Sequence, residues 1–158
     1  MARSVTRLGP DVPLRQADLA RPLPFADDSF DLVLSSLVMH YLEDWTPTLR
    51  EFHRVLVPGG RFVMSTHHPF TDLRISGSDD YFGTYTFGED WIRDGRTMRM
   101  RFWHRPLRAM LASFAARGFG LDEIREPEPS PAMGEVAPKA YRQLRRSTRF
   151  IFFGLTAC

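Results

Sequence analysis

Three histidines follow two apolar segments of the chain. His40 comes shortly after Phe30–Ser35, and His67 and His68 come directly after Arg61–Thr66. Histidine exchanges a proton near neutral pH, which makes it the usual general base of an enzyme. If both segments are parallel strands, the three side chains could face one crevice at the ends of those strands. We expect them to act as a base or to orient an acceptor; packing within loops is the alternative.

The remaining histidine patterns have simpler interpretations. The adjacent pair His67 and His68 suggests a metal site, but no carboxylate or cysteine stands at ligand spacing from it, and no metal is expected. His53 falls at a helical interval on an apolar face and is expected in the core. His104 ends a strand among arginines and is expected at the surface.

The elements that must position these histidines form a strand, helix, strand unit. The apolar run Phe30–Ser35 is typical of a strand buried on both faces, as in a parallel sheet. A short helix is expected over 37–42, and an amphipathic helix begins at the Thr46-Pro47 pair, with threonine as its N-cap. The run 58–60 (Pro-Gly-Gly) ends it before the second strand, Arg61–Thr66. The pattern predicts a parallel crossover.

The rest of the chain is expected to alternate strands, loops and helices. Turns and irregular segments are expected at 19–24, 27–29, 71–80 and 126–138. Strands are expected at 12–17, 81–87, 97–104, 119–125 and 149–156, with 81–87 and 97–104 paired through residues 88–95. Helices are expected from Pro106, ending before a C′ glycine at Gly118, and over 139–146.

The composition is that of a globular domain with its own core. Of the 158 residues, 43% are hydrophobic and 25% charged. No apolar run approaches the ~20 residues of a membrane span, and no secretory signal is expected. The single cysteine, Cys158, excludes an intrachain disulfide, so a cytoplasmic location is expected.

The charge gives weak support to a nucleic-acid-binding module, which is kept as a third hypothesis. The net charge is only +2, and 20 of the 21 basic residues are arginine, which codon bias explains. The alternation of Arg99 and Arg101 with apolar residues is typical of the solvent face of a strand. No nucleic-acid partner is therefore expected.

Two stretches carry a resemblance to a known family. The first comprises Gln16-Ala-Asp18, Leu23-Pro-Phe25 and Asp28-Ser-Phe-Asp-Leu-Val33; the second comprises Leu49-Arg-Glu51 and Arg54-Val-Leu-Val-Pro-Gly-Gly60 followed by Arg61-Phe-Val. In order and spacing, the chain resembles the class I S-adenosylmethionine-dependent methyltransferases, in particular the small-molecule group with the ubiquinone and menaquinone methyltransferases. The C-terminal segments resemble the last helix-strand-helix-strand part of that fold.

The resemblance implies a fold and a domain organisation. The fold is an α/β, Rossmann-like methyltransferase sheet, mostly parallel with an antiparallel last strand, N-terminally truncated and with a small aromatic β insert. We expect one methyltransferase-like domain over 1–158, with the insert at about 71–104.

One departure from the family concerns the cofactor loop. The family fold begins with a strand and a Gly-X-Gly loop, but Gly9 is the only glycine before Gly59, and the triplet Gly118-Phe-Gly120 follows a helix. The resemblance implies that the chain starts near the end of the second crossover, so that a gap separates the strands at Val12 and Phe30. The N-terminal strand could move in to pair there, a partner could cover the gap, or the chain is an incomplete gene product.

The resemblance also implies cofactor-binding residues. Asp18 would accept a hydrogen bond from the adenine amino group of S-adenosylmethionine, with Ala17 and Leu19 beside the ring. Ser35 and Ser36 would lie behind the methionine part and the reacting methyl. A turn-forming aspartate and simple strand termination are the respective alternatives.

An aromatic insert supplies the expected substrate-binding residues. In the family, such inserts determine acceptor specificity, so Tyr81, Phe82, Tyr85 and Trp91 are expected to contact an apolar or aromatic small molecule. The alternative is that they pack within strands.

The function implied is methyl transfer from S-adenosylmethionine to a small, apolar or aromatic acceptor. The alternative is a non-catalytic or incomplete methyltransferase-like subunit that acts through a partner. A homo-oligomer or a complementing chain at the open sheet edge is the corresponding partner expectation.

Overall fold

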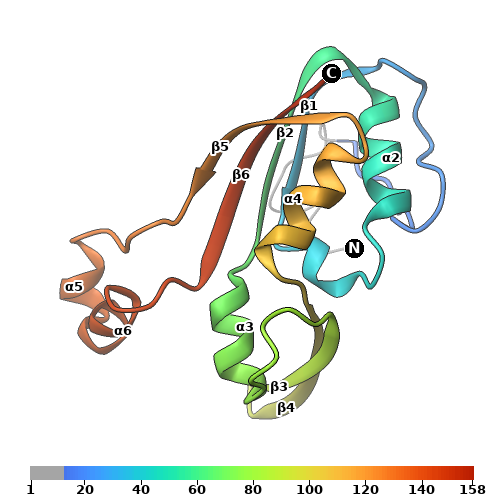
Figure 1. Ribbon diagram of the computed structural model, residues 1–158. Helices are drawn as coiled ribbons and strands as arrows, with labels where there is room; N and C mark the ends of the chain where they lie inside the picture. The colour runs from blue at the N-terminus through green and yellow to red at the C-terminus, as the bar shows by residue number, and fades with distance from the viewer. Residues whose placement is uncertain (1–12) are drawn as a thin grey trace.

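The computed structural model describes residues 13–158, which form an α/β arrangement around a four-stranded sheet (Figure 1). The strands lie in the order β1-β2-β6-β5. β1 (Phe30–Ser36) and β2 (Leu56–His67) are parallel, whereas β6 (Phe150–Ala157) is antiparallel to both β2 and β5 (Phe119–Arg125). Three strands therefore share one direction, and the last strand along the chain opposes them, which confirms the predicted mixed sheet.

Two helices, α2 (Thr46–Val55) and α4 (Leu107–Ala115), cover one face of this sheet (Figure 1). Helix α2 has proline in its first turn as predicted, although Trp45 and not Thr46 is its N-cap. The core lies between these helices and the sheet, where apolar side chains at helical spacing meet alternate strand residues. Its largest fully buried members include Trp45, Leu49, Phe62, Met64, Met110, Phe114, Ile151, Phe153 and Leu155.

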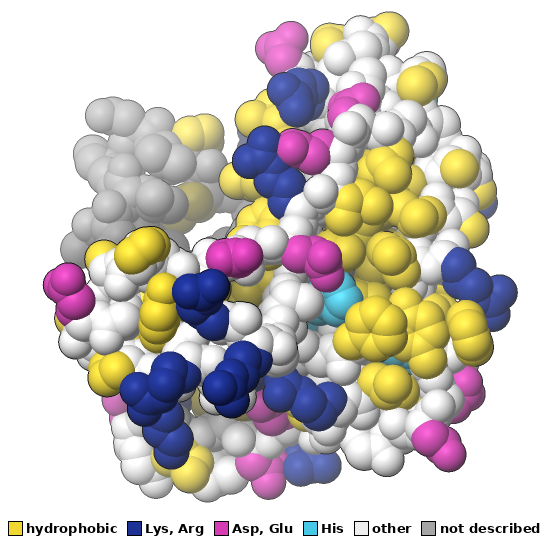
Figure 2. Space-filling view, turned by 60° about the vertical axis from the view of Figure 1, so that its left-hand side comes forward, with side chains coloured by type: hydrophobic (Ala, Val, Ile, Leu, Met, Phe, Trp, Pro, Cys, Tyr) yellow, Lys and Arg dark blue, Asp and Glu magenta, His cyan; other side chains and the backbone are white. Residues whose placement is uncertain are grey.

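The other face of the sheet is open near β1. Leu32 and Leu34 are 54% and 69% exposed, and Phe152 on β6 is 37% exposed. Figure 2 shows hydrophobic side chains gathered on the right-hand part of one face of the molecule. The prediction that β1 is buried on both faces is wrong, because within residues 13–158 this strand pairs only with β2 and no helix covers its outer row.

A helix, α3 (Pro69–Ser76), replaces the irregular stretch predicted after His68. The His68 side chain accepts a hydrogen bond from the Phe70 amide, Pro69 occupies the first turn, and Gly77 ends the helix with a φ of 71°. These are ordinary helix start and stop signals. The sequence analysis did not recognise these signals, because the segment is rich in polar residues.

A tight hairpin follows, formed by β3 (Tyr85–Arg93) and β4 (Arg96–His104). Its two-residue turn, Asp94-Gly95, has φ values of 51° and 71°, as hairpin turns that match the strand twist require. The predicted pairing of two aromatic strands is confirmed, but the strands extend through the segment 88–93 that was expected to be a loop.

The segment before β1 contains no regular element within the described residues. The strand predicted over 12–17 is absent at 13–17, where Pro13 lacks an N–H and no partner strand is adjacent; Val12 lies outside the described residues. The turn at Asp27-Asp28 is confirmed. The remaining elements are η1 (Met39–Tyr41), a 3₁₀ helix, and the short helices α5 (Met133–Val136) and α6 (Pro138–Leu144).

No helix of residues 13–158 is both long enough and apolar enough to cross a lipid bilayer.

Candidate functional site

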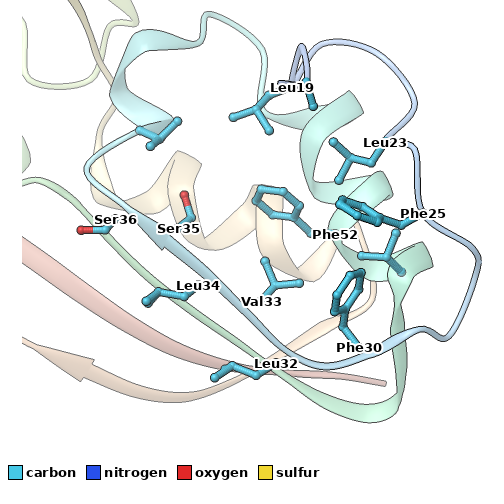
Figure 3. Close-up of a pocket in the computed structure, with 13 residues that line it drawn as sticks. Leu19, Leu23, Phe25, Phe30, Leu32, Val33, Leu34, Ser35, Ser36 and Phe52 are labelled. Atoms are coloured by element: carbon cyan, nitrogen blue, oxygen red, sulfur yellow. The ribbon is translucent and has the colours of Figure 1, made fainter. Parts of the chain in front are cut away.

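An apolar cavity of about 410 Å³ lies beside β1 (Figure 3). Figure 3 shows that Val33 and Ser35 point to one side of the strand, whereas Leu32, Leu34 and Ser36 point to the other, so the cavity extends around the free edge of β1. The residues that line it are Ala17, Leu19, Leu23, Phe25, Phe30, Leu32, Val33, Leu34, Ser35, Ser36, Val38, Phe52 and Val55.

Polar side chains of α2 hold the opposite wall of the cavity in place. Thr48 Oγ1 donates a hydrogen bond of 2.8 Å to the Leu19 carbonyl, and the Leu23 amide donates one of 2.7 Å to Glu51 Oε2. Glu51 is only 5% exposed and pairs with Arg54 at 2.8 Å. The hydrogen bond from Arg54 is the main reason that the pKa of Glu51 is lowered. The sequence offered no signal for this anchoring role.

Asp18 does not line the cavity, although its neighbours Ala17 and Leu19 do. Its Oδ1 accepts a hydrogen bond of 3.0 Å from the Ala20 amide, and its Oδ2 lies 3.4 Å from Arg21. This is the geometry of an aspartate that stabilises its own turn, which was the alternative interpretation. The carboxylate is 61% exposed and so remains accessible to a ligand.

Ser35 and Ser36 lie where the sequence placed them, at the carboxyl end of β1. Both line the cavity, and the hydroxyl of Ser35 is one of three buried side-chain polar atoms without a hydrogen-bond partner among the described residues. A buried hydroxyl without a partner is costly. It is therefore an unpaired polar atom that is shielded from solvent beside the cavity.

Two of the three predicted histidines come together at the carboxyl ends of β1 and β2. The rings of His40 and His67 are stacked, with centroids 3.9 Å apart and planes 18° from parallel. Both are buried, at 4% and 6% exposure. Burial and, to a lesser degree, the neighbouring His67 lower the pKa of His40 to about 3, so this ring is neutral near pH 7.

The ring nitrogens of the two histidines have different partners. His40 Nδ1 lies 3.4 Å from the Thr66 hydroxyl, whereas His67 Nδ1 lies 3.1 Å from the carboxylate of Asp72 on α3. Asp72 is itself 1% exposed, and this burial raises its pKa. The sequence analysis missed Asp72; the helix signals around Pro69 and Gly77 would have placed it one turn from the two adjacent histidines.

His68 points away from this pair. Its Nδ1 accepts the Phe70 amide at the start of α3, and its Nε2 lies 2.8 Å from Glu126. With both nitrogens engaged, this side chain joins α3 to the segment after β5, and neither nitrogen is free to act as a base.

The prediction that His104 lies at the surface is wrong. It is 0% exposed, stacks on Tyr85 at 4.8 Å and donates from Nε2 to the Tyr81 carbonyl at 2.9 Å. It ends β4 where the hairpin packs on α3, and this packing buries it. His53 is half-buried at the margin of the core, with Nε2 3.2 Å from the Cys158 carbonyl.

The four aromatic residues proposed to bind substrate lie on or just before the hairpin and do not line the cavity. Tyr81 stacks on Phe70 at 4.9 Å, and Phe82 and Trp91 are 65% and 37% exposed. Tyr85 is committed to packing on His104. The set therefore forms part of an aromatic surface beside α3, separate from the walls of the cavity.

Comparison with known proteins gives a family match over the N-terminal part of the chain. Residues 1–64 match the model of a family described as "Methyltransferase domain". Malonyl-[acyl-carrier protein] O-methyltransferase 1 of Coxiella burnetii is 43% identical over 67 residues, which cover 41% of this chain. The matched stretch spans only 28%, 24% and 13% of the length of three curated relatives.

Solved structures extend the similarity over the whole chain. An S-adenosylmethionine-dependent methyltransferase from Mesorhizobium loti has a TM-score of 0.77 and 29% identity, covering 99% of this chain and 75% of that one. A Listeria monocytogenes protein described as a candidate methyltransferase of the same kind has a TM-score of 0.82 and covers 100% of this chain and 75% of that one. At 22% identity, the second likeness is one of fold.

Proposed function

Since this chain belongs to the class I S-adenosylmethionine-dependent methyltransferases, we propose that it transfers a methyl group to a small, apolar or aromatic acceptor. The observation that carries the proposal is the cavity at the free edge of β1, whose lining includes Ser35 and Ser36 at the carboxyl end of that strand. Open α/β sheets bind their ligands at the carboxyl ends of their strands. The expected cofactor is S-adenosylmethionine.

The cavity fits the adenosine part of that cofactor. Its walls are apolar at Ala17, Leu19 and Leu23, which suits a purine ring, and Ser35 brings a hydroxyl that lacks a protein partner. A volume of about 410 Å³ is in the range of small-molecule sites. None of the described residues that line the cavity is charged, so the amino acid part of the cofactor has no ionic partner among them.

When bound, S-adenosylmethionine supplies an electrophilic methyl group on a sulfonium, and the electron pair of the broken bond stays on sulfur. The chain contributes by holding the acceptor in line with that methyl, which accounts for much of such catalysis. His40 and His67 lie beyond Ser36 at the same end of the sheet, where they can orient the acceptor or take a proton from it.

An apolar or aromatic acceptor is favoured by the side chains around the histidines. The ring of Phe102 packs against both His40 and His67, and Tyr41 packs against His40 and Phe102. Tyr81, Phe82 and Trp91 extend this aromatic character to the surface. Such surroundings favour a ring or a hydrocarbon over a charged acceptor.

Isothermal titration of the whole chain with S-adenosylhomocysteine tests the proposal. We expect measurable binding, weakened at least 10-fold by Ala17→Phe, which puts a ring into the cavity wall. Ala132→Phe, at an equally exposed alanine just before α5, is the matched control and should leave binding unchanged. Absence of heat from the unmodified chain would contradict cofactor binding.

A second chain at the open sheet edge and a cytoplasmic location stay predictions.

A further inference from the structure

The structure places a buried carboxylate between three histidines at the junction of α3, β2 and β4. Asp72 Oδ1 lies 3.1 Å from His67 Nδ1, and its Oδ2 lies 4.0 Å from His104 Nδ1. The first distance is that of a hydrogen bond, and the second is too long for one. The third histidine, His68, begins the same helix but directs its nitrogens to Phe70 and Glu126. Asp72 therefore has one hydrogen-bonded histidine partner, His67.

A hydrogen bond between an ionised carboxylate and a ring nitrogen fixes the tautomer of a histidine. With an ionised Asp72, which can only accept, Nδ1 of His67 must carry the hydrogen of this 3.1 Å contact, and the lone pair is left on Nε2. Among the described residues, Nε2 of His67 has no hydrogen-bond partner and is not one of the three unpaired polar atoms that are cut off from solvent, which are Ser35 Oγ, His104 Nδ1 and Arg105 Nε. It is therefore the ring nitrogen without a protein partner on a side chain that is only 6% exposed.

His40 is a poor candidate for the base, because burial lowers the pKa of its ring to about 3. Its ring is kept neutral by burial, and its nearest polar partner is the uncharged hydroxyl of Thr66. A proton taken by His40 would have no adjacent carboxylate, whereas a proton on His67 is balanced by Asp72 at 3.1 Å. A buried charge needs such a partner.

We propose that Asp72 is a positioning residue that makes His67 the general base for an acceptor whose nucleophilic atom is a hydroxyl oxygen. The acceptor part rests on the methyl transfer proposed above. In the step, the O–H bond of the acceptor breaks, its electron pair stays on oxygen to form the bond to the methyl carbon, and the proton bonds to His67 Nε2. An amine or thioether that already carries a free lone pair would not need this pair of residues.

Other ionisable groups that face the pair act on the same proton. His104 from β4 and His68 at the start of α3 face Asp72, and His40 from η1 faces His67. Burial raises the pKa of Asp72, while the hydrogen bond from His67 lowers it. A protonated Asp72 would donate to Nδ1 and place the proton of His67 on Nε2, the opposite tautomer.

Nuclear magnetic resonance distinguishes these two states in the unmodified chain. Long-range ¹H–¹⁵N correlations of the histidine rings at pH 7 should show His67 as the Nδ1–H tautomer. Asp72→Ala should remove that preference, whereas Asp79→Ala, at an exposed aspartate beyond α3, should change nothing. A His67 ring in the Nε2–H form in the unmodified chain would overturn the proposal, and this reading needs neither a variant nor a bound cofactor.

A transfer assay tests the acceptor class. With labelled S-adenosylmethionine, matched phenols and anilines should be compared, and we expect transfer to the phenols. Asp72→Asn should lower kcat about 100-fold or more with little change in KM, the usual size of a general-base effect. Transfer to anilines alone, or an Asp72→Asn variant with full kcat, would overturn the proposal. Failure of S-adenosylhomocysteine to bind would instead overturn the proposed function and leave the tautomer result standing.

Discussion

The two faces of the four-stranded sheet have the same apolar character but opposite environments. Phe153 on β6 is 1% exposed beneath α4, whereas its neighbour Phe152 points to the other face and is 37% exposed. On β1, Val33 faces the core, while Leu32 and Leu34 on the opposite side are 54% and 69% exposed. An apolar side chain in this sheet is thus buried beneath the helices and largely exposed on the opposite face near β1.

The open face closes at one end. In the strand register, His67 continues the row of Val63 and Ser65 on β2, yet His67 is only 6% exposed. The ring of Phe102, on the hairpin, packs against it at 4.7 Å. The sheet therefore has three parts: a core covered by helices, a closed end that holds His40 and His67, and an open row beside the cavity, formed by Leu32 and Leu34.

The largest expected effect is in the covered core. Phe153→Ala should lower the free energy of unfolding by about 3–5 kcal/mol, because the cavity it leaves lies among fully buried neighbours. Phe152→Ala is the matched control, and it should cost about 1 kcal/mol or less. Urea unfolding followed by circular dichroism measures both. Equal losses would show that the open face is covered in solution.

The histidine stack should give an intermediate effect that depends on pH. The pKa of His40 falls from 6.5 to about 3 on folding. Between pH 7 and 5, His40 therefore becomes protonated in the unfolded chain but stays neutral in the folded chain. The stability this group contributes is complete above pH 6.5 and is lost as the pH falls, by about 2 kcal/mol at pH 5.

Comparison with His40→Phe isolates this contribution. The variant keeps a ring against His67, but phenylalanine has no proton to gain. Between pH 7 and 5, the free energy of unfolding of the variant should therefore fall by about 2 kcal/mol less than that of the unmodified chain. Asp72, whose raised pKa has the opposite sign, is present in both proteins and cancels to first order. Parallel pH curves would show that His40 is open to water.

The smallest expected effect is on the open row. Leu34→Thr introduces a β-branched residue of good strand propensity and removes an apolar side chain that is 69% exposed. Its free energy of unfolding should change by no more than about 0.5 kcal/mol. A loss above 2 kcal/mol in the same urea experiment would mean that something buries this row.

The sequence predicted the elements whose signals are local. The helix at 46–55, β2 and the strand at 119–125 have apolar residues with proline or glycine close to an end, and β1 is an apolar run directly after the turn at Asp27-Asp28. The prediction failed where burial depends on distant parts of the chain. His104 seemed exposed among arginines, and β1 seemed buried on both faces, because a strand's own residues do not reveal what packs against it.

The candidate site was predicted unevenly for the same reason. Ser35, Ser36, His40 and His67 follow strands, and topology alone brings them to one edge. The contact between Asp72 and His67 could not be predicted, because it depends on α3. The residues of α3 do not show the apolar periodicity by which a helix is recognised from sequence. The anchoring of Leu23 by Glu51 spans 28 residues and has no local signature.

The place of β6 in the sheet has a consequence for how the protein is made. This strand is the last along the chain, yet it lies between β2 and β5 and bonds to both. While a ribosome is still synthesising residues before 150, β2 and β5 have no common partner, and their edges stay unpaired. Completion of the sheet must therefore await synthesis of β6, and chains halted before it should be targets for chaperones.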